Sequence, residues 1–145
     1  MNTTQPTILL AEDDDNDIFF MLRALRKAEI DLPFQVVTNG QEALDYLGGA
    51  GKFAAREDYP LPALMLLDLK MPFIDGFDVL AWLRSNPALN SLPVVVLTSS
   101  PEERDRRKAA ELGARAYFIK PPTAESVKEM LNFLAPCVER LAAPV

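Results

Sequence analysis

The chain has 145 residues, 49% hydrophobic and 25% charged, with a net charge of −6. This is typical of one soluble globular domain, and we expect one over residues 1–145, with a core at about 7–135 and no output domain. The acidic balance argues against a nucleic-acid partner, which normally binds a basic surface. Apolar runs fall far short of the ~20 residues of a membrane span, and MNTTQPT lacks the features of a signal peptide. We expect no membrane partner and a cytoplasmic location, which the single cysteine, Cys137, also fits.

The sequence contains no histidine. A Ser-His-Asp triad and a zinc site built on imidazole are therefore impossible. Any reactive site must use carboxylates, hydroxyls, lysine or a hard cation such as magnesium. If a phosphohistidine takes part in the chemistry, it belongs to another protein.

Five short apolar runs alternate with helix-like stretches along the chain. Runs of this length without alternation are typical of strands buried on both faces of a parallel sheet. The predicted strands are 8–11, 34–37, 63–67, 94–97 and 116–119. The predicted helices lie between and after them: one after Asp14 and Asp15 that carries Ile18, Leu22, Leu25 and Ala28, then 41–47, 77–84, 101–112, and a last one along Val127, Leu131, Leu134, Val138 and Leu141.

Prolines and glycines refine these predicted helices. Pro101 suits the first turn of the fourth helix and Gly113 lies just past its end, whereas Pro136 should kink or break the last helix. The connection 48–62 is long for a compact domain. It is either a flexible insertion or part of a contact surface.

The alternation predicts an α/β fold, a doubly wound five-stranded parallel sheet of the (βα)5 type with right-handed crossovers. In such sheets ligands bind outside the carboxyl ends of the strands, at the topological switch point. With strand order 2-1-3-4-5, the ends of the first, third and fourth strands lie side by side.

Polar residues stand at four of these strand ends. Glu12 and Asp13 follow the first strand, Asp68 the third, Thr98 the fourth and Lys120 the fifth. Each has an ordinary alternative: acids at a helix start, an aspartate in a turn, a threonine cap and a solvated lysine. Because all of these alternatives would have to hold at one edge of one sheet, a common pocket is the better interpretation.

Such a pocket has a chemical use. Two carboxylates ~4 Å apart repel by about 4 kcal/mol at an effective dielectric constant of ~20, so a divalent cation would stabilise the cluster. Oxygen ligands without histidine or thiolate suit Mg²⁺ or Mn²⁺. Asp68 could then act as a nucleophile toward phosphorus and form an aspartyl phosphate. Lys120 would stabilise the transferring group and Thr98 would donate a hydrogen bond to it.

The segments ILLAEDD, LLDLKMPFIDG, VVVLTSS and YFIKP, in this order and spacing, resemble the receiver domains of two-component response regulators, which have a flavodoxin-like, CheY-like fold. The resemblance covers about residues 7–135. It implies a cis peptide bond between Lys120 and Pro121. The roles it implies are these: phosphoacceptor, Asp68; metal ligands, Asp13, Asp68, the Lys70 backbone carbonyl and, through water, Glu12; switch residues, Thr98 and Tyr117; phosphate-pairing lysine, Lys120.

The resemblance also implies partners. A sensor histidine kinase would phosphorylate Asp68 in the presence of Mg²⁺, and the surface of the fourth helix, fifth strand and fifth helix would change and control partner binding. A homodimer, where one forms, would use that surface. The acidic segment EDDDND, the connection 48–62 and the stretch LRSNPALNSLPVVVLTSS are similar to the small regulators that partner phytochrome-type kinases. The only reaction expected of the chain is its own phosphorylation and dephosphorylation.

Three other functions compete with that of a phosphorylated receiver domain. A phosphatase of the haloacid-dehalogenase type generally needs a second aspartate two residues after the nucleophile, where this chain has Lys70. A flavodoxin-like FMN site needs an anion-binding nest after the first strand, where this chain has four acidic residues. The third alternative, a receiver that acts only as an interaction scaffold without phosphorylation, stays open.

Overall fold

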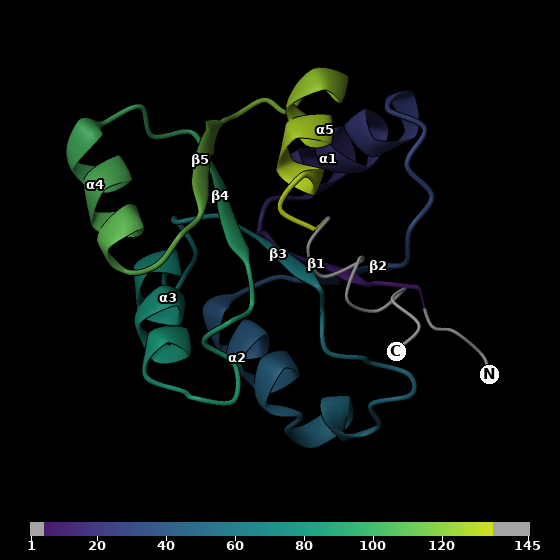
Figure 1. Ribbon diagram of the computed structural model, residues 1–145, viewed down its shortest axis with the longest axis vertical. Helices are drawn as coiled ribbons and strands as arrows, with labels where there is room; N and C mark the ends of the chain where they lie inside the picture. The colour runs from purple at the N-terminus through teal and green to yellow at the C-terminus, as the bar shows by residue number, and fades with distance from the viewer. Residues whose placement is uncertain (1–4, 135–145) are drawn as a thin grey trace, which may run out of the picture.

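The computed structural model describes residues 5–134, which form a five-stranded sheet with helices on both faces (Figure 1). The elements in chain order are β1 (Ile8–Ala11), α1 (Asp15–Lys27), β2 (Phe34–Val37), α2 (Gly40–Gly48), the 3-10 helix η1 (Gly51–Ala54), β3 (Leu64–Leu67), α3 (Gly76–Arg84), β4 (Val94–Thr98), α4 (Glu103–Glu111), β5 (Ala116–Ile119) and α5 (Ala124–Leu131). No helix among these residues is both long and apolar enough to cross a membrane.

All neighbouring strands pair in parallel, in the order β2-β1-β3-β4-β5. The predicted fold class and strand order are therefore confirmed. The central strands β1, β3 and β4 are buried along their whole length, whereas the edge strands β2 and β5 are mostly half-buried. The two edge strands are more exposed than the central strands because each has a neighbouring strand on one side only, but both still contribute residues to the apolar core on each face of the sheet.

The helices form two layers. In Figure 1, α1 and α5 lie together on one side of the sheet, and α2, α3 and α4 lie on the other. Successive residues of each strand face opposite layers, so Leu10 packs with Met21 and Val127 while Leu9 packs with Val79. The sheet lies between two apolar cores, one against each helix layer, and these cores fix the position of the strand ends.

Two helix starts differ in how well they were predicted. Asp14 caps α1 by accepting hydrogen bonds from the backbone N–H groups of Asn16 and Asp17. The placement of Pro101 in the first turn of α4 is wrong, because α4 begins at Glu103. The Ser100 hydroxyl binds Asp105 and accepts from the N–H of Glu102, which holds the backbone around Pro101 in the loop.

The ends of α4 and of the last helix were also predicted from the sequence. Gly113 follows α4 with a φ of 107°, as a helix-ending glycine should. The predicted extension of the last helix to Val138 and Leu141, and its interruption at Pro136, lie outside the described residues.

The connection 48–62 is folded back onto α2. Phe53 is buried and its ring centroid lies 5.0 Å from that of Tyr46 and 5.0 Å from that of Tyr59. The Arg56 guanidinium donates hydrogen bonds to the carbonyl oxygens of Tyr46, Leu47 and Tyr59. The interpretation of this connection as a flexible insertion is therefore wrong, while a role as a contact surface is untested.

Candidate phosphorylation pocket

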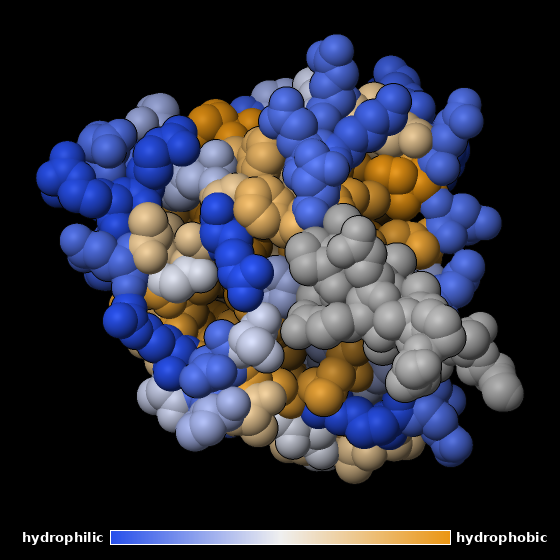
Figure 2. Space-filling view, viewed as in Figure 1, coloured by the Kyte–Doolittle hydropathy of each residue, from blue (hydrophilic) through white to orange (hydrophobic). Residues whose placement is uncertain are grey.

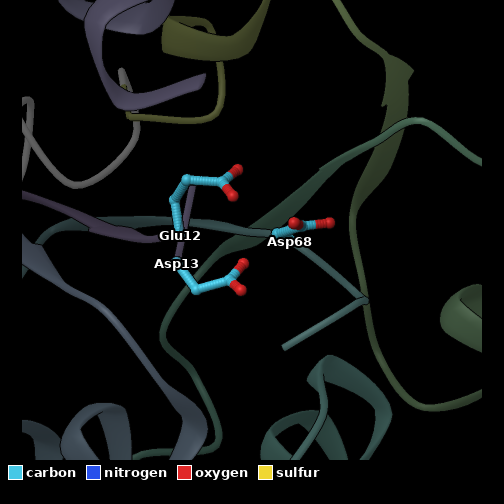
Figure 3. A group of neighbouring side chains, drawn as sticks. All are labelled: Glu12, Asp13 and Asp68. Atoms are coloured by element: carbon cyan, nitrogen blue, oxygen red, sulfur yellow. The ribbon is translucent and has the colours of Figure 1, made fainter. Parts of the chain in front are cut away.

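Three carboxylates meet at the carboxyl edge of the sheet. Figure 3 shows Glu12 and Asp13 leaving the end of β1 and Asp68 leaving the end of β3, with the carboxyl groups directed to the same side. One oxygen from each residue lies within 4.8 Å of the other two. The sheet sets this arrangement, because the N–H of Asp68 donates to the carbonyl of Ala11 and thereby continues the pairing of β3 with β1.

Lys120, directly after β5, contacts two of these three carboxylates. Its Nζ lies 2.7 Å from Glu12 Oε1, 2.7 Å from Asp17 Oδ2 and 3.1 Å from Asp68 Oδ2. Its side chain is 12% exposed. The peptide bond between Lys120 and Pro121 is cis, as predicted, and the N–H of Lys120 donates to the carbonyl of Thr98, which places the end of β5 beside the end of β4.

Burial and mutual charge shift the pKa values in this pocket. Burial raises the pKa of the Glu12 carboxyl to about 7, and the charge of Asp68 acts in the same direction against the lowering effect of Lys120. Burial by itself would lower the pKa of Lys120, but hydrogen bonds to Asp17 and Glu12 and the charge of Asp68 outweigh it and raise that pKa. The pocket therefore favours a cation strongly.

Thr98 and Tyr117 lie around the loop between β4 and α4. Thr98 is fully buried, and its Oγ1 accepts from the N–H of Ser100 at 3.5 Å. The Tyr117 hydroxyl donates to the Ser100 carbonyl at 2.8 Å, and the Arg106 guanidinium carbon lies 4.6 Å from the centroid of the Tyr117 ring. Burial raises the pKa of Tyr117, so its hydroxyl keeps its proton and remains a donor.

Lys70 contributes to the pocket through its backbone. Its side chain is exposed, and its N–H donates to Asp68 Oδ1 at 3.2 Å. The two Asp68 oxygens are therefore held by different groups, Oδ1 by this N–H and Oδ2 by Lys120. The role of the Lys70 carbonyl as a metal ligand stays a prediction.

The geometry disfavours the ordinary alternatives for Glu12, Asp13 and Lys120. The cap of α1 is Asp14, so Glu12 and Asp13 precede the helix and are not needed to start it. Lys120 is bound by three carboxylates and is not a solvated lysine. Thr98 lies in β4, and its Oγ1 accepts from the N–H of Ser100, so the ordinary alternative, a cap of the turn before Pro101, stays open.

One residue of the pocket was missed by sequence reasoning. Asp17, in the first turn of α1, binds Lys120 across 103 positions of the chain. The position of Asp17 in the sequence does carry a signal for this contact. Asp17 is three residues after the helix cap Asp14, and side chains at that position lean back toward the start of the helix, which here is the end of β1.

The donor set fits a hard divalent cation. Glu12, Asp13 and Asp68 offer only carboxylate oxygens, the ligands that Mg²⁺ and Mn²⁺ prefer. Glu12, Asp17 and Asp68 share the single Lys120 ammonium group, and Asp13 adds a fourth carboxylate beside Glu12 and Asp68. A cation would reduce the excess negative charge.

Comparisons with known proteins agree with this arrangement. The family model described as the response regulator receiver domain matches residues 8–132. The response regulator Rcp1 of Synechocystis sp. is 36% identical over 125 residues, which covers 86% of this chain and 83% of that protein. The Mn²⁺-bound structure of Rcp1 covers 97% of both chains with a TM-score of 0.72 and 32% identity.

Two further solved structures are similar over most of their length. The bacteriophytochrome response regulator RtBRR is 44% identical, with a TM-score of 0.81 over 90% of this chain and 78% of that chain. The phosphorylated cyanobacterial phytochrome response regulator RcpA is 31% identical, with a TM-score of 0.74 over 97% of this chain and 96% of that chain.

Proposed function

Because the chain belongs to the family of response regulator receiver domains, it is a receiver of two-component signalling, and we propose that Asp68 accepts the phosphoryl group from a histidine kinase. The observation that carries this proposal is the position of Asp68. It lies among the carboxylates of Glu12 and Asp13, and its Oδ2 is 3.1 Å from Lys120 Nζ. A nucleophile, a cation site and a fixed positive charge thus meet at one point.

In the proposed reaction, one Asp68 carboxylate oxygen forms a bond to phosphorus. The P–N bond of the donor's phosphohistidine breaks, and its electron pair stays on the imidazole. The phosphohistidine must lie outside these 145 residues, because they contain no histidine. Lys120 neutralises negative charge on the transferring group. The chemistry proposed is limited to this exchange and to hydrolysis of the acyl phosphate, and we place it in the cytoplasm.

Glu12, Asp13 and Asp68 would hold Mg²⁺ or Mn²⁺, with the Lys70 carbonyl as a further ligand. When bound, the cation supplies charge neutralisation for the incoming phosphoryl group. Asp13 is exposed and can bind directly, whereas Glu12 is buried and already bound to Lys120, which supports an indirect role for Glu12.

Thr98 and Tyr117 would transmit the phosphorylation of Asp68 to the surface of α4, β5 and α5. We infer that the Thr98 hydroxyl moves to the phosphoryl group and that the loop after β4 follows it. Tyr117 is tied to this loop through the Ser100 carbonyl, so its position changes with the loop, and the surface of α4, β5 and α5 changes with Tyr117. This is a local electrostatic event that biases a two-state element.

The test is incubation with acetyl phosphate and Mg²⁺, followed by intact-mass analysis and hydroxylamine cleavage, which is diagnostic of acyl phosphates. Wild type should gain one phosphoryl group and Asp68→Asn none. Asp31→Asn is a matched control, because Asp31 is exposed and precedes β2 at the opposite edge of the sheet. Equal labelling of Asp68→Asn and wild type would rule out this assignment.

The partner proposed for the chain is a phytochrome-type histidine kinase. The support is the similarity to RtBRR and RcpA, which are phytochrome response regulators. Phosphotransfer from an autophosphorylated bacteriophytochrome kinase should be complete while an unrelated kinase still retains most of its label. The reverse preference would exclude this partner class.

A homodimer is proposed through α4, β5 and α5. Figure 2 shows hydrophilic side chains gathered over α4, whose sequence ERDRRKAAE carries both signs of charge. Ile119 in β5 is 39% exposed. Such an interface would be polar at α4 and sensitive to salt. Light scattering with and without acetyl phosphate tests it, and a monomer in both conditions at high protein concentration would exclude it.

A further inference from the structure

The Lys120 ammonium group has three hydrogens and contacts three carboxylates: it donates hydrogen bonds to Asp17 and Asp68 and forms an ion pair with Glu12. Glu12 and Asp17 each lie at 2.7 Å, and Asp68 lies at 3.1 Å. A lysine ammonium has no further donor. The bond to Asp68 is the longest of the three, so in the resting pocket Lys120 is held more closely by its other two partners than by the proposed phosphoacceptor.

The three partners differ in exposure. The side chains of Glu12 and Asp68 are 3% and 6% exposed, whereas that of Asp17 is 33% exposed. A buried carboxylate that loses its ammonium partner is left uncompensated, which is costly. Asp17 can instead be rehydrated, because water reaches it. The bond to Asp17 is therefore the one that Lys120 can release at the lowest cost.

Phosphorylation of Asp68 adds acceptors that compete for the Lys120 ammonium group. An aspartyl phosphate carries more negative charge and more acceptor oxygens than the carboxylate that it replaces. Because three carboxylates already surround the ammonium group within 3.1 Å, a close contact with the phosphoryl group requires that one of these contacts lengthen or break. The exposed partner, Asp17, is the one expected to give way.

We propose that Asp17 is a positioning residue that holds Lys120 in the resting pocket and competes for it with phosphorylated Asp68. This inference rests on the proposed phosphorylation of Asp68. Asp17 lies in the first turn of α1 and Lys120 directly after β5, so the bond also ties α1 to the segment that leads into α5. Asp17 thus sets how much phosphodonor is needed to fill the site.

The test compares Asp17→Asn with Asp15→Asn. Both substitutions remove one negative charge from the first turn of α1, but Asp15 is exposed and is not one of the three partners of Lys120. The readouts are the acetyl phosphate concentration that gives half-maximal phosphorylation of Asp68 in Mg²⁺ and the half-life of the acyl phosphate. Asp17→Asn should lower that concentration by about fivefold, the size expected for one partly exposed ion pair, and Asp15→Asn should change it less than twofold.

The same pair is then measured in a Lys120→Met background, or Lys120→Gln if the methionine variant does not fold. If Asp17 acts by competing for Lys120, its effect should fall to that of Asp15→Asn once the ammonium is gone. An effect that persists there would identify direct repulsion of the phosphoryl group and would overturn the competition. A higher half-maximal concentration for Asp17→Asn, or equality with Asp15→Asn, would also overturn it. These outcomes leave the phosphorylation of Asp68 intact, whereas a wild type that takes up no phosphoryl group overturns both proposals.

Discussion

A Cβ atom on Gly76 would lie 2.6 Å from the backbone carbonyl oxygen of Asp68 and 2.7 Å from Cα of Leu69. Gly76 is the first residue of α3, and its N–H donates to the Leu69 carbonyl at 2.9 Å. The start of α3 therefore rests directly on the backbone of the proposed phosphoacceptor. Contacts this short with backbone atoms cannot be relieved by a side-chain movement.

We predict that Gly76→Ala displaces the backbone at Asp68. Overpacking of this kind should lower the free energy of unfolding by about 2 kcal/mol and slow phosphorylation by acetyl phosphate about tenfold, since small misplacements of reacting groups are costly. Gly48→Ala is the matched control, because a Cβ at Gly48 meets no atom within 4 Å. Urea unfolding and the phosphorylation rate are measured for both, and equal behaviour of the two variants would contradict the prediction.

The sequence was sufficient for the sheet and for the residues at its edge. Buried strands are marked by local apolar runs, and the switch-point rule brings Glu12, Asp68 and Thr98 together at the ends of the first, third and fourth strands without any knowledge of side-chain direction. Asp17 could not be predicted in this way because it lies on a helix, and its contact with Lys120 depends on how α1 packs over the strand ends. Such packing angles are not encoded in a local pattern.

The connection 48–62 illustrates a second limit. Its composition resembles that of a loop, but three carbonyl oxygens around one arginine and a cluster of three aromatic rings fold it onto α2. The residues of 48–62 that make these contacts do not recur at the spacing of a helix or a strand. Periodicity is the main signal in a single sequence, so a segment ordered by such contacts is read as flexible.

Arg56 gives a direct test of that order. Its Nη1 donates to the carbonyls of Tyr46 and Tyr59, and its Nη2 donates to that of Leu47. Arg56→Lys keeps the charge but loses the planar fork, and we predict a loss of about 1–3 kcal/mol in the free energy of unfolding. Limited proteolysis should cut 48–62 faster in this variant, while phosphorylation of Asp68 is unchanged. The exposed neighbour Glu57, changed to Gln, should have neither effect; equal proteolysis of both variants would contradict the role of Arg56.

Glu12 makes stability depend on pH when no divalent cation is present. In the folded protein its pKa is raised from 4.5 to about 7 by burial, so between these values the folded state binds more protons than the unfolded state. The free energy of unfolding contributed by Glu12 therefore falls as pH rises through this window, by roughly 3 kcal/mol. In a chelator, wild type should lose stability relative to Glu12→Gln from pH 4.5 to 7, and saturating Mg²⁺ should reduce the loss because it favours the ionised carboxylate. Parallel urea-unfolding curves at every pH would contradict this assignment.

Phe73 is held in a strained turn between β3 and α3. Its φ is 68°, its side chain is 96% exposed, and the N–H of Ile74 donates to the Pro72 carbonyl across it at 2.8 Å. A positive φ with this hydrogen bond defines the γ-turn that is rare and strained. Because the ring is exposed, its burial contributes almost nothing to the free energy of unfolding. We predict that Phe73→Gly raises the free energy of unfolding by roughly 0.5–1 kcal/mol, because glycine removes a left-handed cost of about 1–2 kcal/mol at some cost in chain entropy. Phe73→Ala keeps the Cβ and should give no gain in urea unfolding. A gain of the same size in both variants would show that the ring, and not the backbone conformation, is the source of the instability.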